Sequence, residues 1–367
     1  MSLSNCDKAK RYSFIKYSLS LLDTAYLLIL LFIFLASGLS KWLVYAISQI
    51  ATSHFVTFAF YILVILVGYF LFDLPLNFSR TYLVEHKFCL SKQTLGDWLF
   101  DQLKAGLIFY IIGLVMLGVF YFTLGQSPNN WWLAVSLFWI FFSIILAKLT
   151  PTVIIPMFFK YKALGDKQLR QRILDLAKKM RVNILNVFEI DLSSKTLKAN
   201  AAFAGIGKTK RVILADTLKD KYTHDEIEVI LAHEFAHYRL RHILKLIAVN
   251  SLATILVFYI IFRSSGYFLG IFGLSSLMDI AALPLILIYF VLFGVITQPF
   301  ENYISRILEK NADRLALEIT GLKGAFISMM NKLAEQNLAD RKPHPLIKIF
   351  FFDHPPIDER INLADKA

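Results

Sequence analysis

The sequence predicts a mainly α, polytopic membrane protein with about six transmembrane helices and one smaller α+β domain. Its composition is that of a membrane protein, because 57% of the 367 residues are hydrophobic and only 18% are charged. In a typical soluble chain about a quarter of the residues are charged. Six apolar runs each approach the roughly 20 residues that a bilayer core about 30 Å thick requires. The one sizeable polar segment, residues 151–242, mixes helical and strand-like patterns and supplies the α+β domain.

The six apolar runs are Leu19–Leu39, His54–Leu74, Ala105–Leu124, Trp131–Leu149, Ile243–Phe262 and Ala281–Gln298. Residues 36–38 loosely resemble a signal-peptide cleavage site. We expect an uncleaved anchor instead, because the first run is long for a signal peptide and further spans follow it. The fifth run directly continues a helix described below, and the sixth is broken only by Pro284. Four spans therefore lie in residues 1–150 and two in residues 243–300.

The charges of the loops predict the orientation of these spans. The amino end and the segment after the fourth span are basic, whereas the loop Gly125–Asn130 has no charge and the loop after the first span holds only Lys41. By the positive-inside rule, both termini and the 151–242 domain face the cytoplasm. The flanking basic residues also explain the net charge of +12, since no Arg/Lys stripe or recognised module indicates a nucleic-acid partner. Nothing in the sequence indicates an oligomeric state.

The 151–242 domain should contain an amphipathic helix and a small sheet. We expect a helix over Gln168–Met180, strands over Val187–Ile190 and Arg211–Leu214, an extended Asn200–Phe203, and turns at Gly205 and Gly207. A strand beside a catalytic helix could bind a peptide as an additional strand. After the sixth span, residues 301–367 form a second soluble piece that opens with a helix over Asn302–Ile319.

The stretch Leu231–His237 reads H-E-x-x-H, and the rest of the chain is organised around it. On a helix, the i, i+4 spacing places His233 and His237 on one face, where two neutral imidazoles can share a zinc ion. Glu234, about 100° further around the helix, could hold and deprotonate a water molecule at the metal. A capping box at Thr223–Glu226 predicts that the helix begins there.

A catalytic zinc takes three protein ligands, so one more is required. The compact metzincin extension is absent, since Leu240 stands where a glycine is needed and Ile243 where a third histidine is needed. Glu309 and Asp313 lie i, i+4 on one helical face, so Glu309 could bind the metal while Asp313 accepts a hydrogen bond from a ligating imidazole. The alternative is a solvated acidic face that pairs with neighbouring basic residues, and the spacing alone leaves both interpretations open.

Several ordered blocks resemble one family, the integral-membrane CAAX prenyl endoproteases, which are zinc metalloproteases of the gluzincin type. The resemblance extends from about residue 54 to about residue 363. Its blocks are Val84–Phe88 continuing to Lys92–Gly96 and Asp101–Lys104, Asn200–Phe203 with Gly205, Ile213–Leu218, His233–His237, Ser305–Arg306 leading to Glu309 and Asp313, and His354–Arg360.

The resemblance implies a role for each matching residue. Zinc would be bound by His233, His237 and Glu309, with Asp313 behind them and Glu234 as general base. Asn200, followed by Ala201, would contact the substrate backbone, and His354 and Arg360 would stabilise the oxyanion. The last group has ordinary alternatives, namely a turn residue at position 200, a helix start at the two prolines after His354, and an ion pair between Arg360 and Glu359. We interpret His242, just after the motif, as structural.

Four departures from the eukaryotic pattern favour a bacterial member of this family, in the inner membrane. The family's first transmembrane helix has no counterpart, the acidic insertion before the zinc helix is absent, alanine replaces tyrosine after Asn200, and an endoplasmic-reticulum retrieval signal is missing. The implied protein is a zinc metalloendopeptidase, with a helical chamber in the bilayer, that cuts membrane-associated and prenylated CAAX-type peptides. One alternative is a zinc protease for membrane-protein quality control, and another is a transporter or scaffold with an incidental motif.

Overall fold

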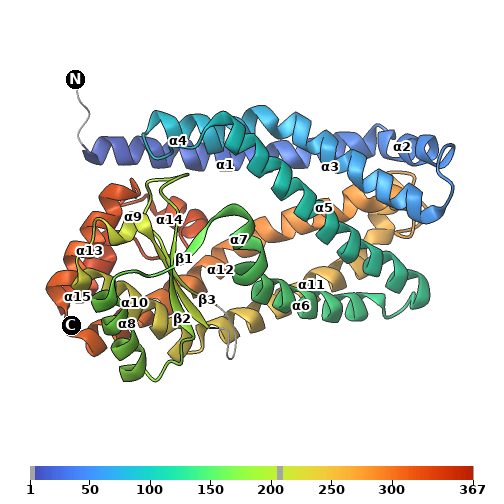
Figure 1. The fold of residues 1–367 in the computed structure, drawn as a ribbon. Helices are drawn as coiled ribbons and strands as arrows, with labels where there is room; N and C mark the ends of the chain where they lie inside the picture. The colour runs from blue at the N-terminus through green and yellow to red at the C-terminus, as the bar shows by residue number, and fades with distance from the viewer. Residues whose placement is uncertain (1–4, 205–209, 367) are drawn as a thin grey trace.

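The computed structural model describes residues 5–204 and 210–366, and it contains six helices long and apolar enough to cross a membrane. The six predicted spans are thereby confirmed. The helices that contain them run side by side (Figure 1). They are α1 (Asn5–Ala36), α3 (His54–Phe78), α5 (Leu95–Gln126), α6 (Trp131–Leu149), α11 (His242–Ile271) and α12 (Leu283–Thr320).

Three predicted helix boundaries need correction. The first span ends at Ala36 rather than Leu39, because Gly38 adopts a left-handed conformation (φ 76°) that separates α1 from α2 (Leu39–Ser48). The sixth span and the predicted helix Asn302–Ile319 form one continuous helix, α12. Pro284 falls in its first turn, where the missing N–H has no helical partner to lose.

The third correction concerns the helix that carries the H-E-x-x-H motif. It does not run straight into the fifth span. Helix α10 (His224–Arg239) ends first, Arg241 adopts a left-handed conformation with φ 56°, and α11 begins at His242. A non-glycine residue in this conformation is uncommon, because its Cβ crowds the backbone.

Four short strands form the sheet of the polar domain, in the order β1-β2-β4-β3. Their bounds are Tyr161–Ala163 for β1, Asn186–Ile190 for β2, Ala201–Ala204 for β3 and Arg211–Ala215 for β4. β2 pairs parallel with β4, and the two outer strands pair antiparallel with their neighbours. Strands β2, β3 and β4 match the predictions closely, and β1 was not predicted. The predicted turns at Gly205 and Gly207 lie outside the described residues.

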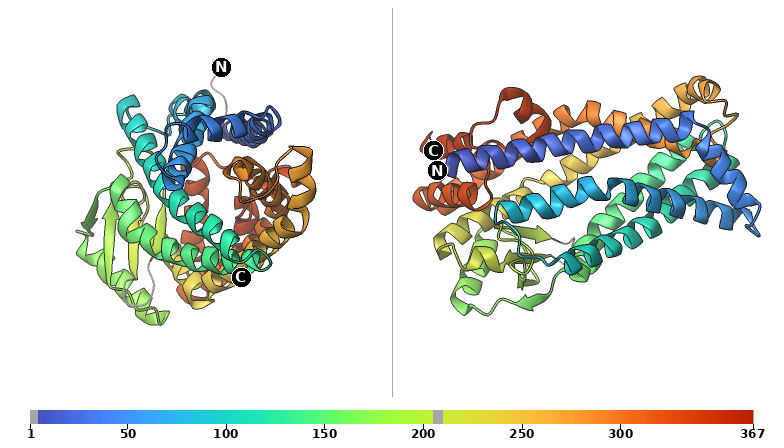
Figure 2. Two further views of the ribbon diagram at one scale, coloured as in Figure 1. Left: turned by 90° about the vertical axis from the view of Figure 1, so that its right-hand side faces the viewer. Right: turned by 90° about the horizontal axis from the view of Figure 1, so that it is seen from above.

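The remaining α-helices are α4 (Val84–Lys87), α7 (Ile155–Phe158), α8 (Lys167–Lys179), α9 (Asp216–Lys219), α13 (Lys323–Gln336), α14 (Pro345–Phe351) and α15 (Ile357–Lys366). Helices α8, α10 and α13 share a core with the sheet. It includes Leu169, Leu214, Leu231 and Phe326, all at most 1% exposed. Seen from the end remote from the sheet, the long helices form a ring (Figure 2). The described parts of both ends of the chain and the sheet lie together at the other end (Figure 1).

Candidate active site

Helix α10 presents the two motif histidines on one face. A complete capping box fixes its first turn, with Thr223 accepting from the Glu226 N–H and Glu226 accepting from the Thr223 N–H. Its opposite face is buried through Leu231 and Phe235, and the Phe235 ring packs edge-to-face on Phe203 of β3 at 5.3 Å. The helix is therefore held by its apolar face, and the Nε2 atoms of His233 and His237 approach to 3.1 Å on the other face.

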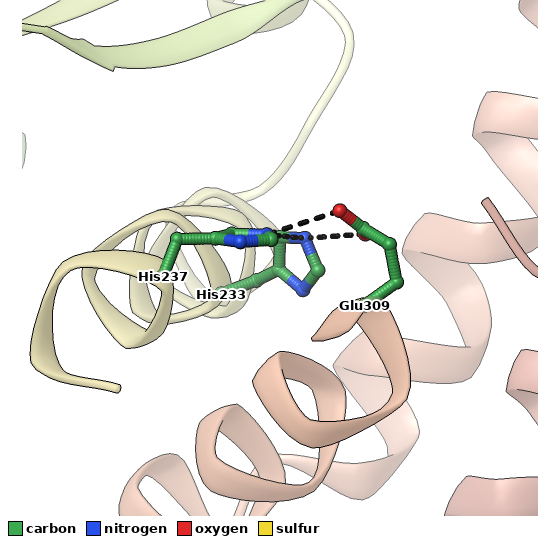
Figure 3. Close-up of side chains that lie close together, drawn as sticks. All are labelled: His233, His237 and Glu309. Carbon is green, nitrogen blue, oxygen red and sulfur yellow. Dashed lines mark hydrogen bonds and ion pairs between the residues drawn. The ribbon is translucent and has the colours of Figure 1, made fainter. Parts of the chain in front are cut away.

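Glu309 enters the same point from α12, beyond the membrane part of that helix. Its Oε2 atom lies 3.1 Å from His233 Nε2, and its Oε1 atom lies 3.2 Å from His237 Nε2 (Figure 3). Although so close, Oε2 is buried without a hydrogen bond of acceptable geometry. One ligand atom from each of the three residues lies within 4.8 Å of the others. The set fits a shared cation, because two imidazole nitrogens and a carboxylate converge at a point where Glu309 Oε2 has no hydrogen-bond donor.

The electrostatics of His233 lead to the same conclusion. Burial alone would lower the pKa of its imidazole, but the neighbouring carboxylates of Asp313 and Glu309 raise that pKa to about 9. The side chain is 10% exposed, so water cannot compensate the surrounding negative charge. The raised pKa favours a positive charge on His233 at neutral pH, and a metal ion could supply that charge in place of the proton.

Asp313 holds His233 from behind. One of its carboxylate oxygens lies 2.9 Å from His233 Nδ1, which leaves Nε2 to face the common point. Arg360 of α15 grips the same carboxylate with two hydrogen bonds, 2.8 Å from Nε and 2.6 Å from Nη2. The guanidinium thus lies behind the ligand and does not point freely at a substrate. It also comes within 3.5 Å of His233 Nδ1, but that nitrogen needs its own proton for Asp313.

A cavity of about 220 Å³ opens onto this centre. Five further predicted site residues line it together with His233, namely Glu234, Asn200, Ala201, His354 and Arg360. His354 is half exposed, with its Nε2 atom 3.4 Å from Glu309 Oε1 and its Nδ1 atom 2.8 Å from Asp353. Asn200 is exposed and lies just before β3. Its carbonyl accepts a hydrogen bond from the Ala215 N–H at the end of β4. The structure therefore brings every predicted site residue to one place, with Asp313 one layer behind.

The sequence interpretation omitted part of the apolar wall and gave the buried His242 a structural role only. Met329, Met330 and Leu333 of α13 line the cavity, from a helix that carries no recognisable motif. His242 is 1% exposed, and its Nδ1 atom lies 3.1 Å from His237 Nδ1. On an unbroken helix, residues five apart lie about 140° apart around the axis. Only the left-handed residue at Arg241 turns the two rings together.

The fold and this centre define a membrane-embedded metalloprotease. Its motif histidines lie on α10, which a short break separates from the span in α11, and its third candidate ligand lies on α12, which contains the sixth span.

Comparisons with known proteins give the family. The model described as peptidase family M48 matches residues 163–367, and that described as "CAAX prenyl protease N-terminal, five membrane helices" matches residues 1–160. The described part of that second region contains four candidate spans. Because one model matches more than half of the chain, the chain belongs to peptidase family M48, in its CAAX prenyl protease branch.

Relatives and a solved structure agree with this assignment. An uncharacterized metalloprotease of Bacillus subtilis, YhfN, is 32% identical over 370 residues, which cover 100% of this chain and 87% of that protein. CAAX prenyl protease 1 of Saccharomyces cerevisiae is 31% identical, over 80% of this chain and 69% of that protein. The crystal structure of Ste24p from S. mikatae has the same fold, with a TM-score of 0.88 and 24% identity over 98% of this chain and 89% of that one.

Proposed function

We propose that this protein is a zinc endopeptidase that cuts peptides at the cytoplasmic face of a bacterial inner membrane. One observation carries the proposal: the His233, Glu234, His354 and Asn200 side chains face a single cavity at the end of the edge strand β3. A peptide laid along the free edge of β3 would pair with its backbone and pass over the metal ligands.

Zinc suits the donor set, because two imidazoles and one carboxylate form a common catalytic zinc site with one position left open. His233, His237 and Glu309 would hold the ion. When bound, zinc acts as a Lewis acid and lowers the pKa of a water molecule toward about 7. The chemistry that remains falls to the side chains around it.

Glu234 would remove a proton from the attacking water and pass it to the leaving amine. It stands next to His233 in the motif and lines the same cavity, which is where such a water would be held. His354, on the same wall, would donate to the carbonyl oxygen as negative charge develops on it, a contribution of about 3–4 kcal/mol for a comparable donor. Burial alone would lower the pKa of His354, but Asp353 and Glu309 raise it, so the donor form is favoured.

The substrates we propose are peptides with a hydrophobic or lipidated carboxyl-terminal region, as the name of the yeast relative suggests. The metal ligands adjoin two spans, α11 and α12, so a membrane tether would hold a peptide near them at high effective concentration. Quality control of misfolded membrane segments is the second candidate, because it would use the same chemistry without lipid recognition. Family membership speaks against the transporter or scaffold hypothesis.

The metal chemistry can be tested with two substitutions. Glu234→Gln should retain stoichiometric zinc and lose peptide hydrolysis, because the ligands survive and only the base is removed. Glu309→Ala should lose both zinc and activity. Zinc content is measured on the purified protein and hydrolysis with a quenched fluorescent peptide. A Glu309→Ala protein with full zinc and near-normal turnover would remove Glu309 from the site.

Substrate preference can be tested with one peptide sequence, with and without a farnesyl group on its cysteine. Each buried CH₂ contributes about 0.8 kcal/mol to membrane or micelle association, so the lipidated peptide should have the higher kcat/KM. Equal values in detergent would mean that the lipid is not used, and the quality-control function would then be favoured.

A further inference from the structure

Helix α4, which continues the helix of the second span, contains a buried carboxylate for which the active site has no direct use. Glu85 lies in the block Val84–Phe88, and its side chain is 12% exposed. Three donors surround it: Tyr12 Oη at 2.8 Å, Lys16 Nζ at 2.8 Å and Lys198 Nζ at 3.0 Å. The first two belong to α1, whereas Lys198 belongs to the polar domain.

This cluster lies in apolar surroundings. Tyr12 and Phe88 pack edge-to-face at 5.1 Å, and both belong to one small buried core with Val84 and Leu90. Lys198 Nζ also donates to Tyr12 Oη at 2.8 Å. Ion pairs that water reaches poorly are stronger than those on an open surface, so Glu85 holds its partners firmly.

Lys198 stands two residues before Asn200 and three before the first residue of the edge strand β3. Its backbone carbonyl accepts from the Thr217 hydroxyl at 2.8 Å, and the next N–H, of Ala199, donates to Asn337 Oδ1 at 3.0 Å. The inner side of the segment is therefore fixed to the polar domain through Thr217 and to the end of α13 through Asn337. Its outer side is fixed by the Lys198 ammonium on Glu85.

The residues that follow α4 also pair with this segment through the backbone. Ser91 and Thr196 form an isolated antiparallel bridge, flanked by hydrogen bonds from Leu197 N to Leu90 O at 2.9 Å and from Ser91 Oγ to Lys195 O at 2.8 Å. The Leu90 N–H in turn donates to the Glu85 carbonyl at 2.8 Å.

His86 connects the residues before and after α4. Its two ring nitrogens lie 2.8 Å from Tyr82 O and 3.0 Å from Gln93 O. Helix α4 and the residues after it therefore form a rigid connection between the membrane part and the segment before β3.

We propose that Glu85 is a positioning residue: through Lys198 it holds the 195–200 segment, and with it the edge of β3, in the place that a bound peptide requires. The inference rests on the proposed function, because it assigns the peptide to that edge. It assigns the block Val84–Phe88 a task, which is to couple α1 and the second span to substrate binding.

The test measures peptide binding and hydrolysis separately. In Glu85→Gln the shape is kept and the charge is lost, so the segment should loosen. KM should rise about tenfold, the effect of 1.4 kcal/mol, while kcat and zinc content stay unchanged, the pattern of a lost binding contribution. In the Glu234→Gln background, the Kd of the uncut peptide, measured by fluorescence anisotropy, should rise by the same factor. Amide exchange should accelerate at residues 195–201 and stay constant at residues 186–190.

Glu189→Gln provides a matched control. Glu189 is a 3% exposed carboxylate that also pairs with two lysines, Lys162 and Lys219, but it lies on β2 away from the cavity. Lys198→Met should reproduce the Glu85→Gln effect and add little to it in the double mutant, as a shared pathway requires.

An unchanged Kd and exchange rate in Glu85→Gln would overturn the proposal. So would an equal loss in both variants with a lower melting temperature and lower kcat, since that result describes general destabilisation. A wild-type protein that binds peptides but cuts none would instead overturn the proposed function. The role of Glu85 would still be decided by comparing the peptide Kd and the amide exchange rates of Glu85→Gln with those of the wild type.

Discussion

The Nδ1 atoms of His237 and His242 lie 3.1 Å apart, across the break between α10 and α11. For His237 to offer Nε2 to a metal ion, its Nδ1 must carry the proton, and that proton then points at His242. His242 Nδ1 must accept it, which fixes the tautomer and the ring orientation of the ligand. A residue outside the motif thus lies directly behind one of the proposed metal ligands.

We predict that His242→Phe raises the Kd for zinc by about 10- to 100-fold, the usual cost of losing an outer partner of a metal ligand. Competition with a chelator of known affinity measures it. His224→Phe is the control, since His224 stands at the other end of α10 and pairs with Asp166. Equal zinc affinity in the two variants would mean that His242 only fills space.

Arg360 could act in either of two ways, by stabilising the oxyanion or by holding Asp313, to which it makes two hydrogen bonds. A role at the oxyanion would make Arg360→Lys lower kcat without changing zinc affinity. The geometry favours a role through Asp313 and His233, because lysine keeps the charge but not the two parallel bonds. We therefore expect weaker zinc binding, with kcat at saturating zinc largely retained.

Arg341→Lys is a suitable comparison for that experiment, as Arg341 bonds Asp358 away from the cavity. If Arg360→Lys loses kcat at saturating zinc while its zinc affinity stays at the wild-type value, the positioning role is wrong and the oxyanion role stands.

Local periodicity explains why the sequence could predict most of the site. The i, i+4 spacings of His233 with His237 and of Glu309 with Asp313 define one face of a helix each, and the structure brings those faces together. The family resemblance supplied Asn200, His354 and Arg360. The left-handed Arg241 could not be predicted, because no glycine or proline marks it, and the position of His242 depends on it. The Glu85–Lys198 pair joins residues more than a hundred positions apart, so no local pattern reveals it.

Glu226, the acidic member of the capping box of α10, should make the stability of the protein depend on pH. Glu226 is 2% exposed and accepts from Lys332 Nζ at 2.7 Å and Ser328 Oγ at 2.6 Å. Burial alone would raise the pKa of its carboxyl, but Lys332, Ser328 and the Thr223 N–H together hold that pKa below its usual 4.5. Because the folded state lowers this pKa, the ionised form stabilises the fold above about pH 4.5, and the contribution disappears as the pH falls through the folded value.

Glu226→Gln should therefore lower the free energy of unfolding at pH 7 by about 1.5–3 kcal/mol, the value of a hydrogen bond to a charged group. The difference from wild type should shrink as the pH is lowered past 4.5. Thermal unfolding in detergent at several pH values measures it, with Asp225→Asn on the exposed side of the same turn as control. A difference that is constant with pH would show that the carboxylate charge is not responsible.

The orientation of the bundle can be tested at its two ends. The connection between α5 and α6 lies at the end of the bundle remote from the sheet (Figure 1), and it carries no charge. Lys41, the only charged residue between the first two spans, is occupied there, since its Nζ donates to the carbonyls of Phe272 at 3.0 Å and Gly273 at 2.6 Å. It thus caps the end of α11.

A cysteine at Asn129, an exposed position in that connection, should react with an impermeant thiol reagent added to intact cells. A cysteine at Asp220, exposed beside the sheet, should react only after permeabilisation. Asp220 is preferable to its neighbour Lys219, whose ammonium bonds Glu189 at 3.1 Å. The background needs Cys6→Ser and Cys89→Gly, with glycine at position 89 because its φ is 59°. Labelling of position 220 in intact cells, with position 129 protected, would place the metal centre outside the cytoplasm and rule out substrates presented from the cytosol.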